Sequence, residues 1–238
     1  MGLIDSIRHA LRDVVGVICP DVCTVCGRRL VDSEEIICLD CLLHMPVTGI
    51  HGGGLTRLHE RVASTRYYVD RAASLMWYYR DSDYARLIHD AKYNNRPKVA
   101  RYLAGMMARE LIGYGFFDDI DVIIPIPLHF TKMLSRGYNQ AQVIADAVSA
   151  VTGIEVRDNI ICRHAHSTQT RKGIAARDAN ARESYAIERP DELDGKHILL
   201  VDDVMTTGAT LRACLDLIAS HCKSPRLSIL TLAAAQMQ

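Results

Sequence analysis

The run His197–Thr210 limits the fold more than any other part of the chain, because a buried strand changes there into a helix. His197–Val201 is almost wholly apolar, two carboxylates follow at Asp202 and Asp203, and a Thr/Gly turn leads into a helical pattern over 210–221. In open α/β sheets, ligands sit at the carboxyl ends of such strands. The run therefore predicts an α/β fold with a ligand site at this strand end.

The turn itself has the composition of an anion site. Its backbone N–H groups and those of the new helix can bind phosphate, and Gly208 can take a conformation closed to residues with a Cβ. Thr206, Thr207, Ala209 and Thr210 complete the loop. The two carboxylates would repel a phosphate, but they suit the vicinal hydroxyls of a ribose or a Mg²⁺ ion. The alternative is an acidic strand end before an ordinary capped helix.

This segment resembles the signature of type I phosphoribosyltransferases that binds 5-phosphoribosyl-1-pyrophosphate (PRPP). In that signature the acidic pair, here Asp202 and Asp203, grips the ribose, and the loop wraps the 5′-phosphate. Purine-salvage members carry an Asp as general base just before the Thr-Gly of the loop. Thr206 stands there in this chain. The resemblance thus implies an acceptor that needs no such base, or no turnover at all.

A cysteine cluster indicates a structural metal site. Cys23 and Cys26 form one Cys-x-x-Cys pair, Cys38 and Cys41 form another, and eleven residues separate the two pairs. Four thiolates at about 2.3 Å suit tetrahedral Zn²⁺ and leave no open position for catalysis. Cys19 and His44 are spare candidate ligands. The remaining cysteines, Cys162, Cys214 and Cys222, fall on predicted core positions.

Strands and helices alternate along most of the chain, which predicts a mostly parallel sheet covered by helices on both faces. We expect a short helix over 3–15 and a Gly-rich linker or loop over 48–54. Further strands are expected over 72–79, 121–128, 154–162 and 226–232, and further helices over 83–93, 98–113 and 139–151. The predicted division is a zinc ribbon with helix and linker (1–60) and a phosphoribosyltransferase-like domain (61–238).

Three middle motifs, with the cysteine pairs and the loop, resemble the ComF/GntX family. They are Leu87–Tyr93, then Pro125–Leu128 with Arg136–Gln140, and finally Gln169 with Arg177–Asn180. The family implies a bacterial protein with a type I phosphoribosyltransferase fold and, in several members, a role in competence or in the use of external DNA. Basic residues on loops or helix starts, Arg136, Arg177, Arg171 and Lys172, could hold the pyrophosphate of PRPP with Mg²⁺, although for each one taken alone a solvated surface charge is the favoured interpretation.

Two functions remain open at this point. The first is Mg²⁺-dependent phosphoribosyl transfer from PRPP. The second is a non-catalytic PRPP- or nucleotide-sensing competence factor that binds single-stranded DNA and works with the DNA-uptake machinery. Aromatic and basic residues interleave around Trp77–Lys98, as in single-strand binders, but a buried strand followed by an amphipathic helix gives the same pattern.

Charge and hydropathy exclude some classes of function. Lys+Arg and Asp+Glu balance at 28 each, so no global field favours nucleic acid or an anionic membrane. No apolar run approaches the ~20 residues of a membrane span, and the N-terminal sequence lacks the features of a signal peptide. We therefore expect a cytoplasmic protein, a reducing setting in which crowded cysteines favour metal over disulfides.

Overall fold

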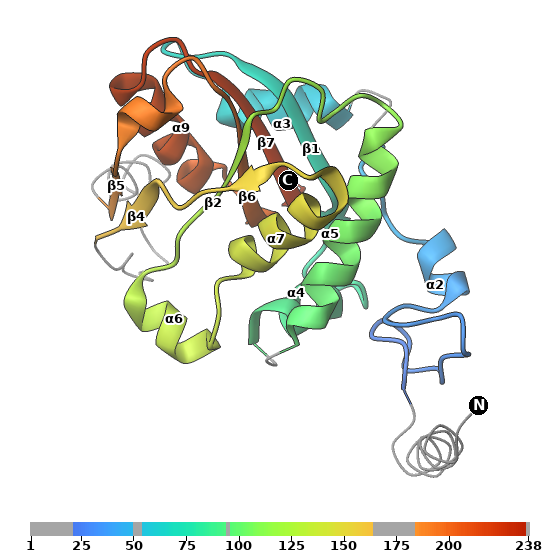
Figure 1. Ribbon diagram of the computed structural model, residues 1–238. Coiled ribbons are helices and arrows are strands. Elements are labelled where there is room, and N and C mark those ends of the chain that lie inside the picture. Colours follow the sequence, from blue (N-terminus) through green and yellow to red (C-terminus); the bar gives the residue numbers. More distant parts are fainter. Residues whose placement is uncertain (1–20, 50–53, 94–95, 164–183, 237–238) are drawn as a thin grey trace, which may run out of the picture.

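The computed structural model describes residues 21–49, 54–93, 96–163 and 184–236. A five-stranded parallel sheet in the order β1-β7-β6-β2-β3 forms its centre (Figure 1). The strands are β1 (Val69–Tyr78), β2 (Val122–Pro125), β3 (Glu155–Val156), β6 (His197–Met205) and β7 (Arg226–Ala235). The predicted fold class, a mostly parallel sheet flanked by helices, is confirmed.

Helices cover both faces of the sheet. One face carries α4 (Ala85–Tyr93), α5 (Pro97–Ile112) and α7 (Gln140–Thr152), and the other carries α3 (Gly54–Val62) and α9 (Ala209–His221). Successive side chains of a strand point to opposite faces. On β6, Leu199 and Val201 accordingly belong to the α5/α7 core, whereas Ile198 and Leu200 belong to the α3/α9 core.

The predicted strand over 154–162 is wrong as a single element. It divides into β3 in the main sheet and β4 (Ile160–Cys162), which pairs antiparallel with β5 (Tyr185–Ile187) in a separate two-stranded sheet. The fully buried Asn159 stands at the break, and its Nδ2 donates to the carbonyls of Glu188 (3.1 Å) and Arg189 (3.3 Å). These bonds turn the chain out of the main sheet toward β5.

Other elements differ in their bounds. β6 extends to Met205, because its pairing with β7 continues as far as Met205 and Ala234, so the two carboxylates lie within the strand rather than after it. β2 stops at Pro125, where prolines at 125 and 127 lack the N–H that a ladder needs. Helices α3 and α6 (Phe130–Arg136) and the short 3-10 turn η1 (Pro190–Leu193) were not predicted. The helix predicted over 3–15 lies outside the described residues.

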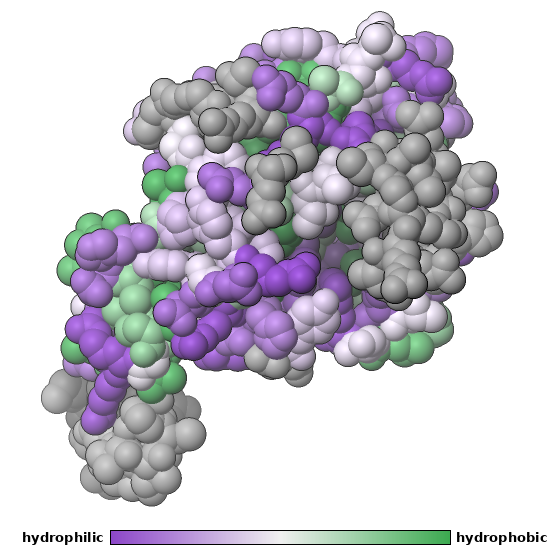
Figure 2. Space-filling view, turned by 180° about the vertical axis from the view of Figure 1, so that it is seen from behind, coloured by the Kyte–Doolittle hydropathy of each residue, from purple (hydrophilic) through white to green (hydrophobic). Residues whose placement is uncertain are grey.

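The cysteine-containing segment, 21–49 with the short helix α2 (Leu39–Leu43), docks on the edge strand β1 and on α4. Leu75 and Trp77 exchange backbone bonds with Thr48 and Pro46, at 3.2 and 2.7 Å. The hydroxyl of Tyr84 donates to the carbonyl of Cys41 at 2.7 Å. Seen from behind, this segment shows hydrophobic surface (Figure 2), where the side chains of Val31, Leu39 and Leu43 are exposed.

Over the described residues, no helix combines the length and the apolar character needed to cross a bilayer.

Candidate functional site

The predicted phosphate loop joins the end of β6 to the start of α9. Residues 206–208 form a bend, and Gly208 caps the helix with φ +77°, in the left-handed region. Asp202 and residues 204–211 line a small cavity of about 40 Å³ at this turn. The amides of Thr207 and Gly208 meet no acceptor among the described residues. The first amides of a helix have no partner within the helix, but that of Ala209 donates to Thr207 Oγ1 at 3.4 Å. The loop can therefore offer an anion mainly the amides of Thr207 and Gly208.

Gly208 is required by its surroundings as well as by its φ. A Cβ at this position would lie 2.8 Å from the carbonyl oxygen of Arg61 and 3.1 Å from Nη1 of Arg212. That same Nη1 donates to the Arg61 carbonyl and, at 2.8 Å, to the carbonyl of Thr207. Arg61 lies in the last turn of α3, and its own Nη1 lies 3.5 Å from the Thr206 carbonyl. The two arginines, which sequence reasoning missed, hold the loop from outside.

The acidic pair is divided between the two faces of the sheet. Asp203 points toward α4, whereas Asp202 points toward α9, where it acts electrostatically on Cys214 and Tyr185. Burial raises the pKa of Asp202 to about 7, and the charge of Asp203 adds to the rise. The amide of Asp203 opposes it by donating to Asp202 Oδ1 at 2.8 Å. The two carboxylates therefore lie on opposite faces of the sheet at this edge.

Asp203 has a cationic partner, Lys92, which lies within the Leu87–Tyr93 motif although no role was predicted for it. Lys92, in the last turn of α4, places its Nζ 3.0 Å from Asp203 Oδ1, and both side chains are largely buried, with 20% and 12% exposed. In water-poor surroundings such a pair gives each charge a counter-charge. Lys92 thus belongs to the candidate site.

The Arg136–Gln140 motif connects α4 to the rest of the site. Tyr138 donates its hydroxyl to the carbonyl of Ala91 at 2.6 Å, and Gln140 Nε2 lies 3.5 Å from the carbonyl of Lys92. Asn139 caps α7 by accepting from Ala141 (3.1 Å) and donates to the carbonyl of Ile126 (3.0 Å). These bonds fix the end of α4, and with it Lys92, against the end of β2.

Of the predicted pyrophosphate cations, the structure describes only Arg136. Its guanidinium lies 5.2 Å from the ring centroid of Tyr93, donates to Gln140 Oε1 at 2.8 Å, and lowers the pKa of Asp202 slightly against the effect of burial. Arg177, Arg171 and Lys172 lie outside the described residues. The structure thus brings Arg136 and Lys92 to the acidic pair.

The four predicted zinc ligands converge. The Sγ atoms of Cys23, Cys26, Cys38 and Cys41 lie within 4.8 Å of one another, three of these residues are buried, and Gly27 makes the turn after the first pair with φ +75°. Burial raises the pKa of Cys23, but nearby backbone amides outweigh it and lower the value to about 7. Burial and the neighbouring sulfurs raise the pKa of Cys41. Four close sulfurs with this donor set fit Zn²⁺.

The aromatic and basic residues between 77 and 98 do not form one stripe. Trp77 packs with the α3/α9 core beneath the guanidinium of Arg61 (5.9 Å), whereas Tyr78 and Tyr84 pack on the opposite core. Tyr79 and Tyr93 are exposed, 40% and 57% respectively. Trp77, Tyr78 and Tyr84 are therefore half-buried against the two cores, and only Tyr79 and Tyr93 among the described residues of this stretch are exposed aromatic residues.

A model of the phosphoribosyl transferase domain matches residues 97–235. The chain belongs to this family. Competence protein F of Haemophilus influenzae is 35% identical over 131 residues, which cover 52% of this chain and 57% of that protein. DNA utilization protein YhgH of Escherichia coli K12 is 24% identical over 198 residues, 80% of each chain. These relatives and the cysteine cluster confirm the predicted ComF family.

Two solved structures have a low similarity to this chain, both in sequence and in fold. Purine phosphoribosyltransferase from Pyrococcus horikoshii is 20% identical, with a TM-score of 0.35 over 56% of this chain and 70% of that chain. Glutamine phosphoribosylpyrophosphate amidotransferase from B. subtilis is 19% identical, with a TM-score of 0.40 over 60% and 30% of the two chains. Likenesses of this size bear on no individual residue.

Proposed function

We propose that this chain binds PRPP together with Mg²⁺ and transfers its phosphoribosyl group to an acceptor. The observation that carries the proposal is the left-handed Gly208 in a loop with free amides, held by Arg61 and Arg212 beside a carboxylate pair. The 5′-phosphate would lie on the amides of residues 206–210, with the hydroxyls of Thr206, Thr207 and Thr210 as further donors. Asp202 and Asp203 would accept from the ribose hydroxyls.

The leaving pyrophosphate needs positive charge, which Arg136, Lys92 and, in our proposal, Arg177 would supply. In the transfer, the bond between ribose C1 and the pyrophosphate oxygen breaks and that oxygen keeps the electron pair. A nucleophilic atom of the acceptor forms the new bond to C1 from the opposite side, so the configuration inverts. Mg²⁺ would be held by the carboxylates and by PRPP itself, and would offset the charge that develops on the leaving group.

In the ligand-free site, the negative charge of Asp203 needs a counter-charge, and Lys92 supplies it. Its ammonium neutralises Asp203 at 3.0 Å. When PRPP and Mg²⁺ bind, the metal and the ribose hydroxyls would replace Lys92 as the partners of Asp203. Lys92 could then turn toward the pyrophosphate. Both partners of the buried pair thus retain a counter-charge in the free and in the bound state, which avoids the cost of an unpaired buried charge.

A specific observation also favours a second candidate. Thr206, at the position of the purine-salvage base, is exposed and cannot act as a base. This supports a non-catalytic factor that senses PRPP or a nucleotide and binds single-stranded DNA. The names competence protein F and DNA utilization protein YhgH support, for either candidate, a role in competence or in the use of DNA. A cytoplasmic location and a link to nucleotide metabolism are part of our proposal and do not come from these names.

One experiment separates the two candidates. Protein, Mg²⁺ and PRPP are incubated with each candidate acceptor, and release of pyrophosphate is measured, with Asp203→Asn as the control variant. Acceptor-dependent release that the variant loses supports transfer. Binding of PRPP with no release in the presence of any acceptor would support the sensing role instead.

A further inference from the structure

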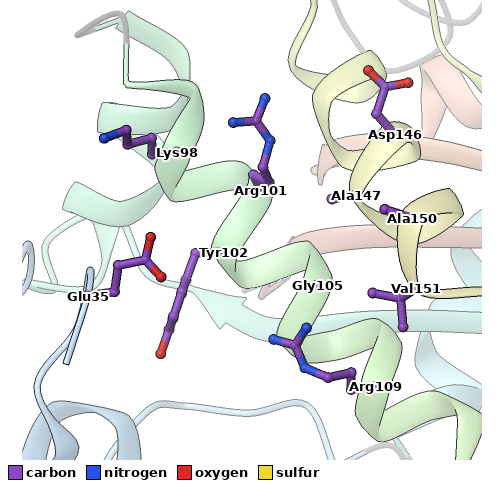
Figure 3. A pocket seen from close by; sticks show the side chains of 10 residues that line it. All are labelled: Glu35, Lys98, Arg101, Tyr102, Gly105, Arg109, Asp146, Ala147, Ala150 and Val151. Atoms are coloured by element: carbon purple, nitrogen blue, oxygen red, sulfur yellow. The ribbon is translucent and has the colours of Figure 1, made fainter. Parts of the chain in front are cut away.

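A second cleft lies on the outer face of α5 and shares no lining residue with the phosphate loop (Figure 3). Its volume of about 400 Å³ is that of a small-molecule site. Three segments enclose it: α5, α7, and the cysteine-containing segment, which contributes Glu35. Neither the loop nor the zinc ligands account for this cleft.

One face of α5 supplies the polar lining. Lys98, Arg101, Tyr102, Gly105 and Arg109 follow one another at spacings that align side chains along a helix. Figure 3 shows the guanidinium groups of Arg101 and Arg109 at the two ends of the cleft, with Gly105 between them. Lys98 stands one turn before Arg101, so two cations lie at one end and one at the other.

Three cations and two carboxylates line the cleft, so its lining carries a net positive charge. Among the described residues, Lys98, Arg101 and Arg109 make no ion pair and no hydrogen bond. The cleft has two carboxylates, Glu35 and Asp146, and Asp146 instead accepts from Gln142 Nε2 at 2.8 Å. Like charges along a helix repel one another. An anion between them removes that repulsion, and arginine with lysine is the pairing that binds phosphate groups.

Gly105 shapes the floor of the cleft. A glycine inside a helix lowers its stability relative to alanine. A Cβ here would touch only the guanidinium of Arg109, at 3.5 Å, which is an ordinary contact, so packing does not require glycine. The absence of a side chain at Gly105 makes the cleft deeper, and the planar guanidinium of Arg109 lies over this position. Such a plane stacks well on a nucleobase.

The remaining wall is aromatic and apolar: Tyr102 from α5, and Ala147, Ala150 and Val151 from α7. We propose that this cleft binds a nucleoside monophosphate. Its phosphate lies between Lys98 and Arg101, and its base lies against Tyr102 and the guanidinium of Arg109. The volume of about 400 Å³ leaves room for one nucleotide.

Titration calorimetry with adenosine 5′-monophosphate tests this site. The titration is repeated on Gly208→Ala protein, whose loop should take no phosphate, so that binding at the loop is separated from binding in the cleft. That variant should bind the nucleotide once per chain and should not bind adenosine, which lacks the phosphate. Arg101→Ala and Arg109→Ala should each weaken binding at least about ten-fold, and Gly105→Leu, which fills the floor, should abolish it.

Arg80→Ala is the matched control, because Arg80 is an exposed cation outside the cleft. It should bind the nucleotide as wild type does. The positions at Arg101 and Arg109 are exposed on a helix, where alanine is well tolerated, and thermal unfolding checks that the variants fold. The proposal is overturned if wild type does not bind the nucleotide, if the two arginine variants bind it unchanged, or if only a single-stranded oligonucleotide binds.

Discussion

Lys92 Nζ lies 3.0 Å from Asp203 Oδ1 and joins the end of α4 to the end of β6 across the proposed ligand edge. The pair is mostly buried, so removal of either charge leaves the other without a partner in poor solvent. We expect Lys92→Met and Asp203→Asn each to lower the free energy of unfolding by about 1–3 kcal/mol.

The double variant tests whether this loss comes from the pair. Lys92→Met with Asp203→Asn should cost clearly less than the sum of the two single changes in urea unfolding, because no charge is left alone. The exposed pair of Arg189 with Asp158, at 3.2 Å, is the comparison, and Asp158→Asn should cost well under 1 kcal/mol. Additive costs at Lys92 and Asp203 would contradict a coupled pair.

Asp202 should lower stability as its carboxyl ionises. Burial raises its pKa to about 7, above the unfolded value. The folded state therefore binds the extra proton between about pH 4 and 7, and stability falls as pH rises through that window. Asp202→Asn should raise Tm at pH 8 by several degrees (about 2–4 °C per kcal/mol), and much less at pH 5. An equal change at both pH values would rule out this origin.

The cysteine cluster should bring about one zinc per chain. Cys38→Ser should lose the metal and melt the segment 21–49, since structural zinc contributes on the order of 10–16 kcal/mol in small modules. Because that segment bonds to Trp77 and Tyr84, tryptophan fluorescence should report the loss while the main sheet keeps its far-UV signal. Cys162→Ser, outside the cluster, is the control and should keep the zinc. Metal analysis that finds no zinc in wild-type protein purified without chelator would refute the site.

If the chain binds single-stranded DNA, Tyr93 is the exposed aromatic residue most suited to it, with Arg136 over its ring. Affinity should then fall steeply as salt rises, and Tyr93→Ala should cost about 1–3 kcal/mol. Tyr79→Ala removes the other exposed ring of the 77–98 stretch and shows whether the effect belongs to Tyr93 alone. Fluorescence anisotropy that shows no binding at low ionic strength would leave these residues without a DNA role.

The features that depend on one short segment of the chain could be predicted from the sequence. The strand, carboxylates, glycine and helix at 197–221 appear in order, and the four cysteines between 23 and 41 converge, because each feature is formed within one continuous segment of the chain. Lys92, Arg61 and Arg212 were missed because their partners are distant in the chain and meet only when the sheet is assembled. Adjacent carboxylates were treated as one pair, although strand geometry sends Asp202 and Asp203 to opposite faces. The break at Asn159 was missed because its partners lie on β5 and beyond.

Calorimetry of PRPP with Mg²⁺ on wild type, Asp203→Asn and Gly208→Ala tests the central claim most directly. Wild type should bind PRPP once per chain, and Asp203→Asn should lose about 1.5–3 kcal/mol of binding free energy yet still bind inorganic phosphate, whose donors are the amides of the loop. Gly208→Ala should lose both ligands, because its Cβ would meet the Arg61 carbonyl at 2.8 Å. Wild type that ignores PRPP, or a Gly208 variant that binds it equally well, would contradict the proposed site.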